Sequence, residues 1–201
     1  MTSRNEQEVI LDHVFESNDN LETALKLCFN FDAIKERLLR KFISDLTYKT
    51  LKGLGNQWQK TLPFRPTPTN VLEQWYVVGF EKKDWGKAPF SIALSAQKPS
   101  ANEFIIGIYG KGKESKLNKT YGSDLKKIVD EKYDKGSSSD GWWWYQNLED
   151  EYLNWTNKDF LLKLIDKESK TELIDYFKNE LLLLAQTTES EISKMIKSGL
   201  V

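Results

Sequence analysis

The spacing of apolar residues changes along the chain and predicts helices at both ends with a sheet between them. In residues 1–52, apolar residues recur every three or four positions, which is typical of amphipathic helices. The same spacing returns over 157–198, whereas the period changes to two within 71–148. We therefore expect a single α+β domain over residues 1–201, in which an antiparallel sheet of about four strands is flanked by N-terminal and C-terminal helices.

Four segments within residues 71–148 combine β-branched and aromatic residues with turn-forming residues at their ends. They are 71–80, 89–96, 103–110 and 142–148. The connections between the first three are short, which favours an antiparallel meander over parallel crossovers. One inserted helix is expected over about 123–134, and the serine-rich stretch 135–141 is expected to be a loop.

The strongest helix signal runs from Asp32 to about Lys52, where apolar residues form one face and most basic residues lie off it. Two shorter helices are expected before it, over about 4–16 and from residue 21 onward. Cys28 falls within the apolar stripe of the second, so we interpret it as a small core residue. The alternative interpretation is a reactive thiol.

The C-terminal helical region carries two signals of interruption. The residues at 168–171 predict a break in the helix. Thr188, with Glu191 three positions later, forms the pattern of a capping box. We therefore expect a short last helix that begins at Thr188.

Charge is unevenly distributed, although its totals nearly cancel. The 201 residues carry 29 Lys and Arg against 30 Asp and Glu, so the net charge predicts no bulk attraction to nucleic acid or membranes. Residues 1–31, however, hold six acidic residues and two basic ones, and residues 35–60 hold seven basic residues and two acidic ones. Residues 111–127 hold six lysines and two acidic residues. Such patches steer charged partners.

The sequence offers few residues for several kinds of chemistry, because it contains one His and one Cys. Zinc sites and Ser–His–Asp or Cys–His catalysis need more of these residues, and His13 is expected at a helix surface. Cys28 alone forms no internal disulfide. The first residues contain no apolar signal segment, and the longest apolar run, 181–185, is too short to span a membrane. We therefore expect a cytoplasmic protein with no metal, no cofactor and no membrane association.

Glu81 and Lys83, at the end of the first predicted strand, are the candidate catalytic residues. An E-x-K pattern on a strand is half of a site in which two carboxylates hold Mg²⁺ and a lysine stabilises charge on the attacked phosphate. The other half needs an acidic residue on an adjacent strand, where only Glu103 is available. The pattern supports the hypothesis of a minimal nuclease; the alternative is a chance match in a chain with 29% charged residues.

The run Trp142-Trp143-Trp144-Tyr145 is the candidate binding segment. On a strand, successive side chains point to opposite faces, so Trp143 and Tyr145 are expected on one face and Trp142 and Trp144 on the other. One pair belongs to the core, and the other is either covered by helices or forms an exposed aromatic surface. We take Trp143 and Tyr145 as binding residues. The lysine-rich loop supplies four more candidates: Lys111, Lys113, Lys116 and Lys119.

The order of these features resembles a known group of proteins. A basic helix and strands containing Ile105-Ile106-Gly107-Ile108 are followed by Trp142–Tyr145 and by Trp155 leading into Phe160. Over about residues 32–185, this order is similar to the C-terminal accessory region of uncharacterised bacterial proteins of the PD-(D/E)XK nuclease superfamily. The nuclease core of that family lies N-terminal to this region, and only about 31 residues precede it here, so the resemblance implies a sensing or binding half without the catalytic half.

Three functional hypotheses follow. The first is a non-enzymatic binding or regulatory protein that occupies a macromolecular partner, most simply a protein, in a phage–bacterium conflict. The second is a minimal or degenerate Mg²⁺-dependent nuclease that uses Glu81 and Lys83. The third is a nucleic-acid-binding module that uses the basic helix at 35–52.

Overall fold

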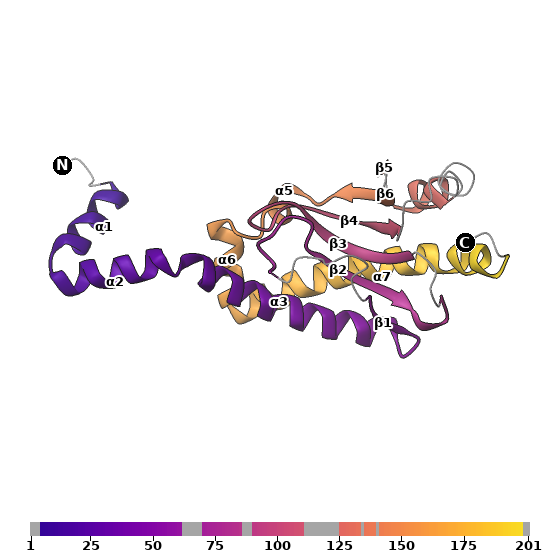
Figure 1. Cartoon of the computed structure of the whole chain (residues 1–201), viewed down its shortest axis with the longest axis horizontal. Helices are drawn as coiled ribbons and strands as arrows, with labels where there is room; N and C mark the ends of the chain where they lie inside the picture. The colour runs from indigo at the N-terminus through magenta and orange to yellow at the C-terminus, as the bar shows by residue number, and fades with distance from the viewer. Residues whose placement is uncertain are drawn as a thin grey trace. The chain divides into compact units, whose positions relative to one another are not determined.

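The computed structural model of the protein divides into two compact units, Met1–Arg37 and Leu38–Val201, where the sequence predicts one domain. The described residues are 5–61, 70–85, 90–110, 125–133, 135–139 and 141–198. Among these residues, the first unit holds only helices, and the second holds the sheet and the remaining helices (Figure 1).

The first unit consists of α1 (Glu6–Phe15), α2 (Asn18–Phe29) and the beginning of α3 (Phe31–Leu54). Side chains cap the first two helices, which satisfies backbone N–H groups that have no partner within the helix. The Asn5 side chain accepts a hydrogen bond from the N–H of Gln7 at 3.3 Å, and the Ser17 hydroxyl accepts one from the N–H of Asn20 at 3.1 Å. These local contacts define the helices, because neither α1 nor α2 contains a buried residue.

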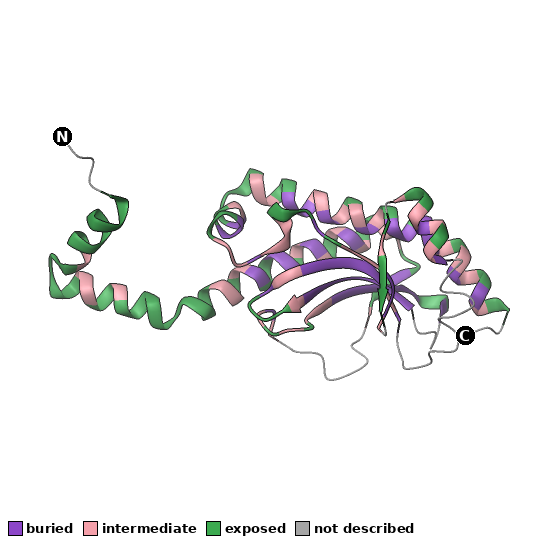
Figure 2. Cartoon of the chain, turned by 90° about the horizontal axis from the view of Figure 1, so that it is seen from above, coloured by how far each residue is buried: buried purple, intermediate pink, exposed green. Residues whose placement is uncertain are grey.

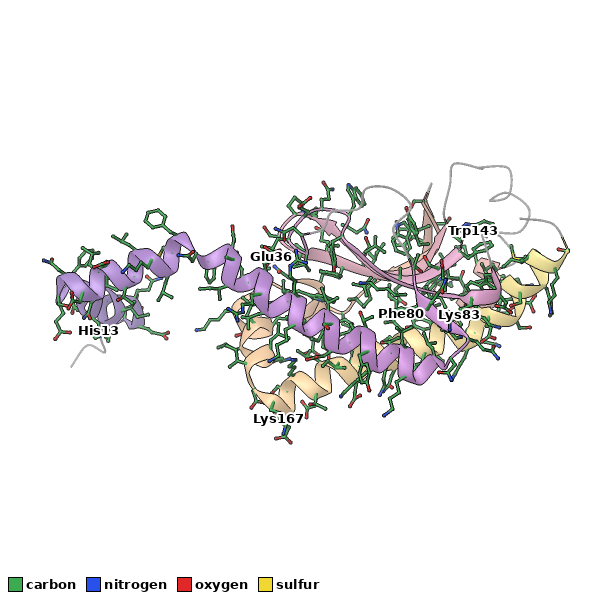
Figure 3. All side chains as sticks on the ribbon, turned by 60° about the horizontal axis from the view of Figure 1, so that its bottom comes forward. His13, Glu36, Phe80, Lys83, Trp143 and Lys167 are labelled. Atoms are coloured by element: carbon green, nitrogen blue, oxygen red, sulfur yellow. The ribbon has the colours of Figure 1, made fainter. Side chains whose placement is uncertain are left out.

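The prediction that Cys28 is a core residue is wrong, because this side chain is exposed. An apolar stripe becomes core only where another element covers it, and the stripe of α2 is not buried. His13 lies on α1, is exposed as expected and contacts Glu16 at 3.1 Å (Figure 3).

The second unit contains one antiparallel sheet with the strand order β1-β2-β3-β4-β6-β5. The strands are β1 (Trp58–Lys60), β2 (Val77–Lys82), β3 (Phe90–Lys98), β4 (Asn102–Gly110), β5 (Ser137–Ser139) and β6 (Trp142–Asn147). The predicted α+β class and antiparallel pairing are confirmed. The strand number of about four is wrong, because the described sheet has six. The two unexpected strands, β1 and β5, are three-residue edge strands, which pair by backbone hydrogen bonds and need no apolar pattern.

The first strand also begins later than the predicted segment 71–80. Residues 71–75 form turns and a bend, and Trp75 has a φ of 67°. This left-handed backbone interrupts the extended chain, and the Trp75 N–H donates to the carbonyl oxygen of Ala96 at 2.9 Å. The strand proper therefore starts at Val77. The other three predicted strands agree with β3, β4 and β6 to within two residues.

The helical part of the second unit includes the remainder of α3 and the long α7 (Lys167–Lys197), which lie on one face of the sheet (Figures 1 and 2). The shorter elements are η1 (Lys83–Trp85), helical residues 125–132, α5 (Asp150–Leu153) and α6 (Lys158–Ile165).

The predicted interruptions at 168–171 and at Thr188 are wrong, because α7 is continuous. The chain instead breaks at Asp166, whose carboxylate accepts a hydrogen bond from the N–H of Ser169 at 2.8 Å and caps α7. The Thr188 hydroxyl donates to the carbonyl oxygen of Leu184 at 2.7 Å, one turn earlier in the same helix.

An aromatic cluster around Trp155 joins the sheet to the helices. The Trp155 ring stacks on Phe104 of β4 with centroids 3.7 Å apart, and it meets Phe42 of α3 edge-on at 5.2 Å. Phe160 of α6 and Phe177 of α7 lie 5.6 and 5.1 Å from the same ring. Trp155 has no exposed surface, so this cluster forms the centre of the core.

We predict that Gly107→Ala destabilises the protein by about 3 kcal/mol, whereas Gly141→Ala changes its free energy of unfolding by less than about 1 kcal/mol. A Cβ atom at Gly107 would lie 2.3 Å from the backbone oxygen of Trp144, which forces β4 and β6 apart. A Cβ atom at Gly141 would meet only a Tyr109 ring carbon, at 3.6 Å. Urea unfolding of the two variants tests this difference, and equal stabilities would show that β4 and β6 are not packed this closely.

Candidate binding surfaces

A β-bulge in β6 changes which faces its aromatic side chains occupy. Ile108 of β4 pairs with Trp144, and the next residue, Tyr109, pairs with Trp142, so Trp143 is an extra residue in β6. Trp143 and Trp144 consequently both belong to the core on the helix-covered face. Trp142 and Tyr145 belong to a second cluster on the opposite face. The predicted pairing of Trp143 with Tyr145 on one face is therefore wrong.

Trp143 is 7% exposed and packs inside the second unit (Figure 3). Its ring meets Phe90 with centroids 4.8 Å apart. Its indole nitrogen lies so close to Gly110 that a Cβ atom there would be only 2.3 Å away. Of the two predicted aromatic binding residues, Trp143 is buried and Tyr145 is half-buried. The four candidate lysines, Lys111, Lys113, Lys116 and Lys119, lie outside the described residues.

Asp130 holds the indole of Trp144 in place. One oxygen of its carboxylate accepts hydrogen bonds from the Trp144 ring nitrogen and from the N–H of Gly136, both at 2.9 Å. The other oxygen accepts one from Lys126. Partial burial acts to raise the pKa of Asp130, but these three hydrogen bonds favour the ionised form and lower the pKa below its usual value.

The candidate catalytic pair lies at the end of β2. Glu81 is 8% exposed and accepts a hydrogen bond from the side-chain nitrogen of Gln59 at 3.0 Å. Lys83 follows in η1 and is exposed (Figure 3). Lys82 between them is buried and forms an ion pair with Glu189 of α7 at 2.8 Å. The hydrogen bond to Glu189 is the main cause that raises the pKa of Lys82, although burial opposes it.

Glu103, the expected carboxylate partner of Glu81, lies on β4, and β3 separates this strand from β2. It pairs instead with Lys98. In the described part of the chain, no three His, Cys, Asp or Glu side chains gather in a metal-binding arrangement. The nuclease hypothesis is therefore supported only by the local pattern of Glu81 and Lys83. Glu103, which the sequence offered as the second carboxylate, does not lie on a strand next to β2.

The first unit exposes many large apolar side chains. We call residues 5–37 the N-terminal arm. Nine of its large apolar side chains are exposed: Val9, Ile10, Leu11, Phe15, Leu25, Leu27, Phe29, Phe31 and Ile34. Figure 2 shows exposed and intermediate residues along α1 and α2. Helical periodicity in the sequence does not show whether apolar side chains such as these are covered by another element.

The same arm is acidic. Residues 5–37 contain eight acidic side chains and three basic ones, Lys26, Lys35 and Arg37. Lys26 forms an i, i+4 ion pair with Glu22 on the exposed surface of α2. The arm therefore combines exposed apolar side chains with a negative charge.

Comparisons with protein-family models, with curated proteins and with solved structures found no match. The resemblance to accessory regions of the PD-(D/E)XK superfamily therefore stays a prediction. None of the described helices combines the length and apolar character that a membrane span requires.

We predict that Trp143→Ala lowers the free energy of unfolding by about 3–5 kcal/mol, because it removes a buried indole that packs on Phe90. Tyr145→Ala should cost less, since this side chain is half-buried. Chemical denaturation measures both values. If the Trp143 variant were as stable as the unmodified chain, Trp143 would not be a core residue, and the binding role predicted from the sequence would stand.

We predict that Asp130→Asn destabilises the protein by about 2 kcal/mol at neutral pH, because charge-assisted hydrogen bonds are lost. The pKa of Asp130 is lowered in the folded state, so its contribution is present above the usual pKa of 3.8 and is lost as the pH falls through the folded-state pKa.

The stability difference between Asp130→Asn and the unmodified chain should thus shrink in acid. The exposed Asp150→Asn is the matched control and should follow the unmodified chain. Thermal unfolding between about pH 3 and 7 measures these differences. A difference that is the same at every pH would contradict the assignment.

Proposed function

We propose that the protein is a non-enzymatic binding protein that captures a protein partner through its N-terminal arm. One observation carries this proposal: α1 and α2 bury no side chain, while nine large apolar side chains of the arm are exposed. A high density of exposed large apolar side chains is typical of interaction sites. Full burial of one such side chain contributes about 1.5–3 kcal/mol, and part of the sum offsets the entropy that association costs.

The charge of the arm indicates the chemistry of its partner. Its acidic side chains complement basic groups, whereas its apolar side chains need a groove that excludes water. We therefore infer a partner protein with an apolar groove and a basic rim, which receives the arm as a helix in a groove.

The lengths of the helices support a role in binding. Helix α1 has 10 residues and α2 has 12, and isolated helices this short are marginal in water even when they are well capped. A partner that covers the apolar side chains would stabilise the helices at the same time as it binds them. Binding and helix formation are thus coupled.

The setting of a phage–bacterium conflict and the location in the cytoplasm stay predictions, of which the first rests on the resemblance to nuclease accessory regions. The nuclease alternative rests on the spacing of Glu81 and Lys83 alone. The binding proposal uses neither of these residues, so the two hypotheses are separable by mutation.

We predict that Phe15→Ala combined with Phe29→Ala weakens capture of the partner at least about tenfold, without a change in thermal stability. These side chains are 69% and 85% exposed, and alanine preserves the helices. The control is Ile165→Ala in α6, since Ile165 is also 69% exposed but lies outside the arm. Capture by the full-length chain from a lysate of the native host, with mass spectrometry, identifies candidate partners.

Each candidate is then purified, and its affinity is measured by calorimetry at low and at moderate salt. The proposal predicts direct binding that the arm variant loses, that the Ile165 variant keeps and that weakens with salt. Equal binding by both variants would refute it. A concentration-dependent dimer that the arm variant abolishes, seen by sedimentation, would also overturn it, because the occupant would then be a second copy of the chain.

A further inference from the structure

A pocket of about 340 Å³ opens in the second unit beside α3. Helix α3 contributes one side of it, and residues from the β1–β2 part of the chain contribute the rest. Its polar lining consists of Arg40, Ser44, Thr47, Tyr48, Lys60 and Tyr76. All of the described lining side chains are basic, hydroxyl-bearing or apolar, and none is acidic.

Two cations from separate elements meet at this pocket. Arg40 comes from α3, and Lys60 comes from β1. Lys60 forms no ion pair with a described residue, so its charge is available to a ligand. Two positive charges on one concave surface, with no acidic side chain in its described lining, favour an anion.

Hydrogen-bond donors accompany these charges. The hydroxyl oxygen of Thr47 is buried and has no hydrogen-bond partner among the described residues, which is unfavourable, so a ligand that reaches it would supply the missing partner. Burial is the main cause that raises the pKa of Tyr76, and the nearby Arg40 opposes it, so the Tyr76 hydroxyl keeps its proton at neutral pH. The pocket thus offers neutral O–H donors beside two cations.

We propose that this pocket binds the phosphate group of a small phosphorylated molecule. Arg40 and Lys60 compensate its charge, and Thr47 and Tyr76 donate hydrogen bonds to its oxygens. Tyr48, which is 69% exposed, offers its ring to the organic part of the ligand. The volume of the pocket is in the range of small-molecule sites and is too small for an extended nucleic-acid groove. This inference is independent of the N-terminal arm.

The site assigns a narrower role to the basic helix than the nucleic-acid hypothesis does. In that hypothesis every exposed basic side chain on α3 contributes similarly to binding, because each contacts a phosphate of an extended nucleic-acid backbone. In the pocket model, Arg40 contributes to binding. Lys41 and Lys52 are exposed on the same helix but do not line the pocket, so they contribute nothing to binding. The two models therefore differ in which charges matter.

Calorimetry on the full-length chain tests the proposal with AMP, adenosine, inorganic phosphate and acetate as probes. We expect AMP to bind and adenosine not to bind, since the phosphate supplies the recognised group. Binding of AMP more tightly than inorganic phosphate would identify an organic phosphate as the ligand class. Arg40→Gln with Lys60→Gln should weaken AMP binding at least about tenfold. The matched control, Lys41→Gln with Lys52→Gln, removes the same charge and should weaken it less than about threefold.

Thr47→Val supplies a second, independent measurement. It removes the unpartnered hydroxyl at nearly constant volume, so the ligand-free protein should unfold at the same or a higher temperature, while AMP binds several-fold more weakly. A variant that loses stability without losing affinity would show a structural role for this hydroxyl and contradict its place in the site.

Three results would overturn the proposal. The first is no binding of AMP or phosphate at concentrations up to about 10 mM. The second is equally tight binding of acetate, which would identify a carboxylate site. The third is binding of a single-stranded oligonucleotide that falls steeply with salt and is weakened equally by both double variants, which would identify a nucleic-acid surface.

Discussion

Trp155 lies where β4, α3, α6 and α7 meet, and its ring contacts a phenylalanine from each of them. Its indole N–H donates to the carbonyl oxygen of Tyr152 at 2.9 Å, so the one polar group of this buried ring is satisfied. The same packing holds residues 38–54 of α3 within the second unit through Phe42. Arg40 precedes Phe42 by two residues and therefore lies on another side of the helix, toward the proposed phosphate pocket. The geometry of that pocket thus depends on a core contact that does not line it.

The bulge at Trp143 determines which side chains of β6 enter the core. Because it inserts one residue into β6, two consecutive tryptophans enter the same core and Trp142 turns to the second face. The close approach of Gly107 to β6 allows this arrangement, since any side chain there would collide with the β6 backbone. The three consecutive tryptophans therefore serve in packing. Asp130 fixes Trp144 by a hydrogen bond.

The two units differ in what stabilises them. The second unit buries aromatic and aliphatic side chains from its helices and one face of its sheet. Helices α1 and α2 have caps and surface ion pairs but no buried side chain, and such contacts contribute only tenths of a kcal/mol to about 1 kcal/mol each. In the proposed function, burial of the arm against a partner would add to their stability. An apolar stripe is therefore core in one part of this chain and exposed in another.

The sequence by itself determined the elements whose signal is local: the helical ends, the strands β3, β4 and β6, and the α+β class. Periodicity and turn residues act over a few positions, so they predict these elements well. Only the tertiary structure decided what covers each face. It paired the edge strands β1 and β5, continued α7 through Thr188, turned Trp143 into the core and left Cys28 exposed. It also brought Arg40 and Lys60 to one pocket from separate elements. These outcomes depend on contacts between residues far apart in the chain, and no local pattern specifies which surfaces will meet.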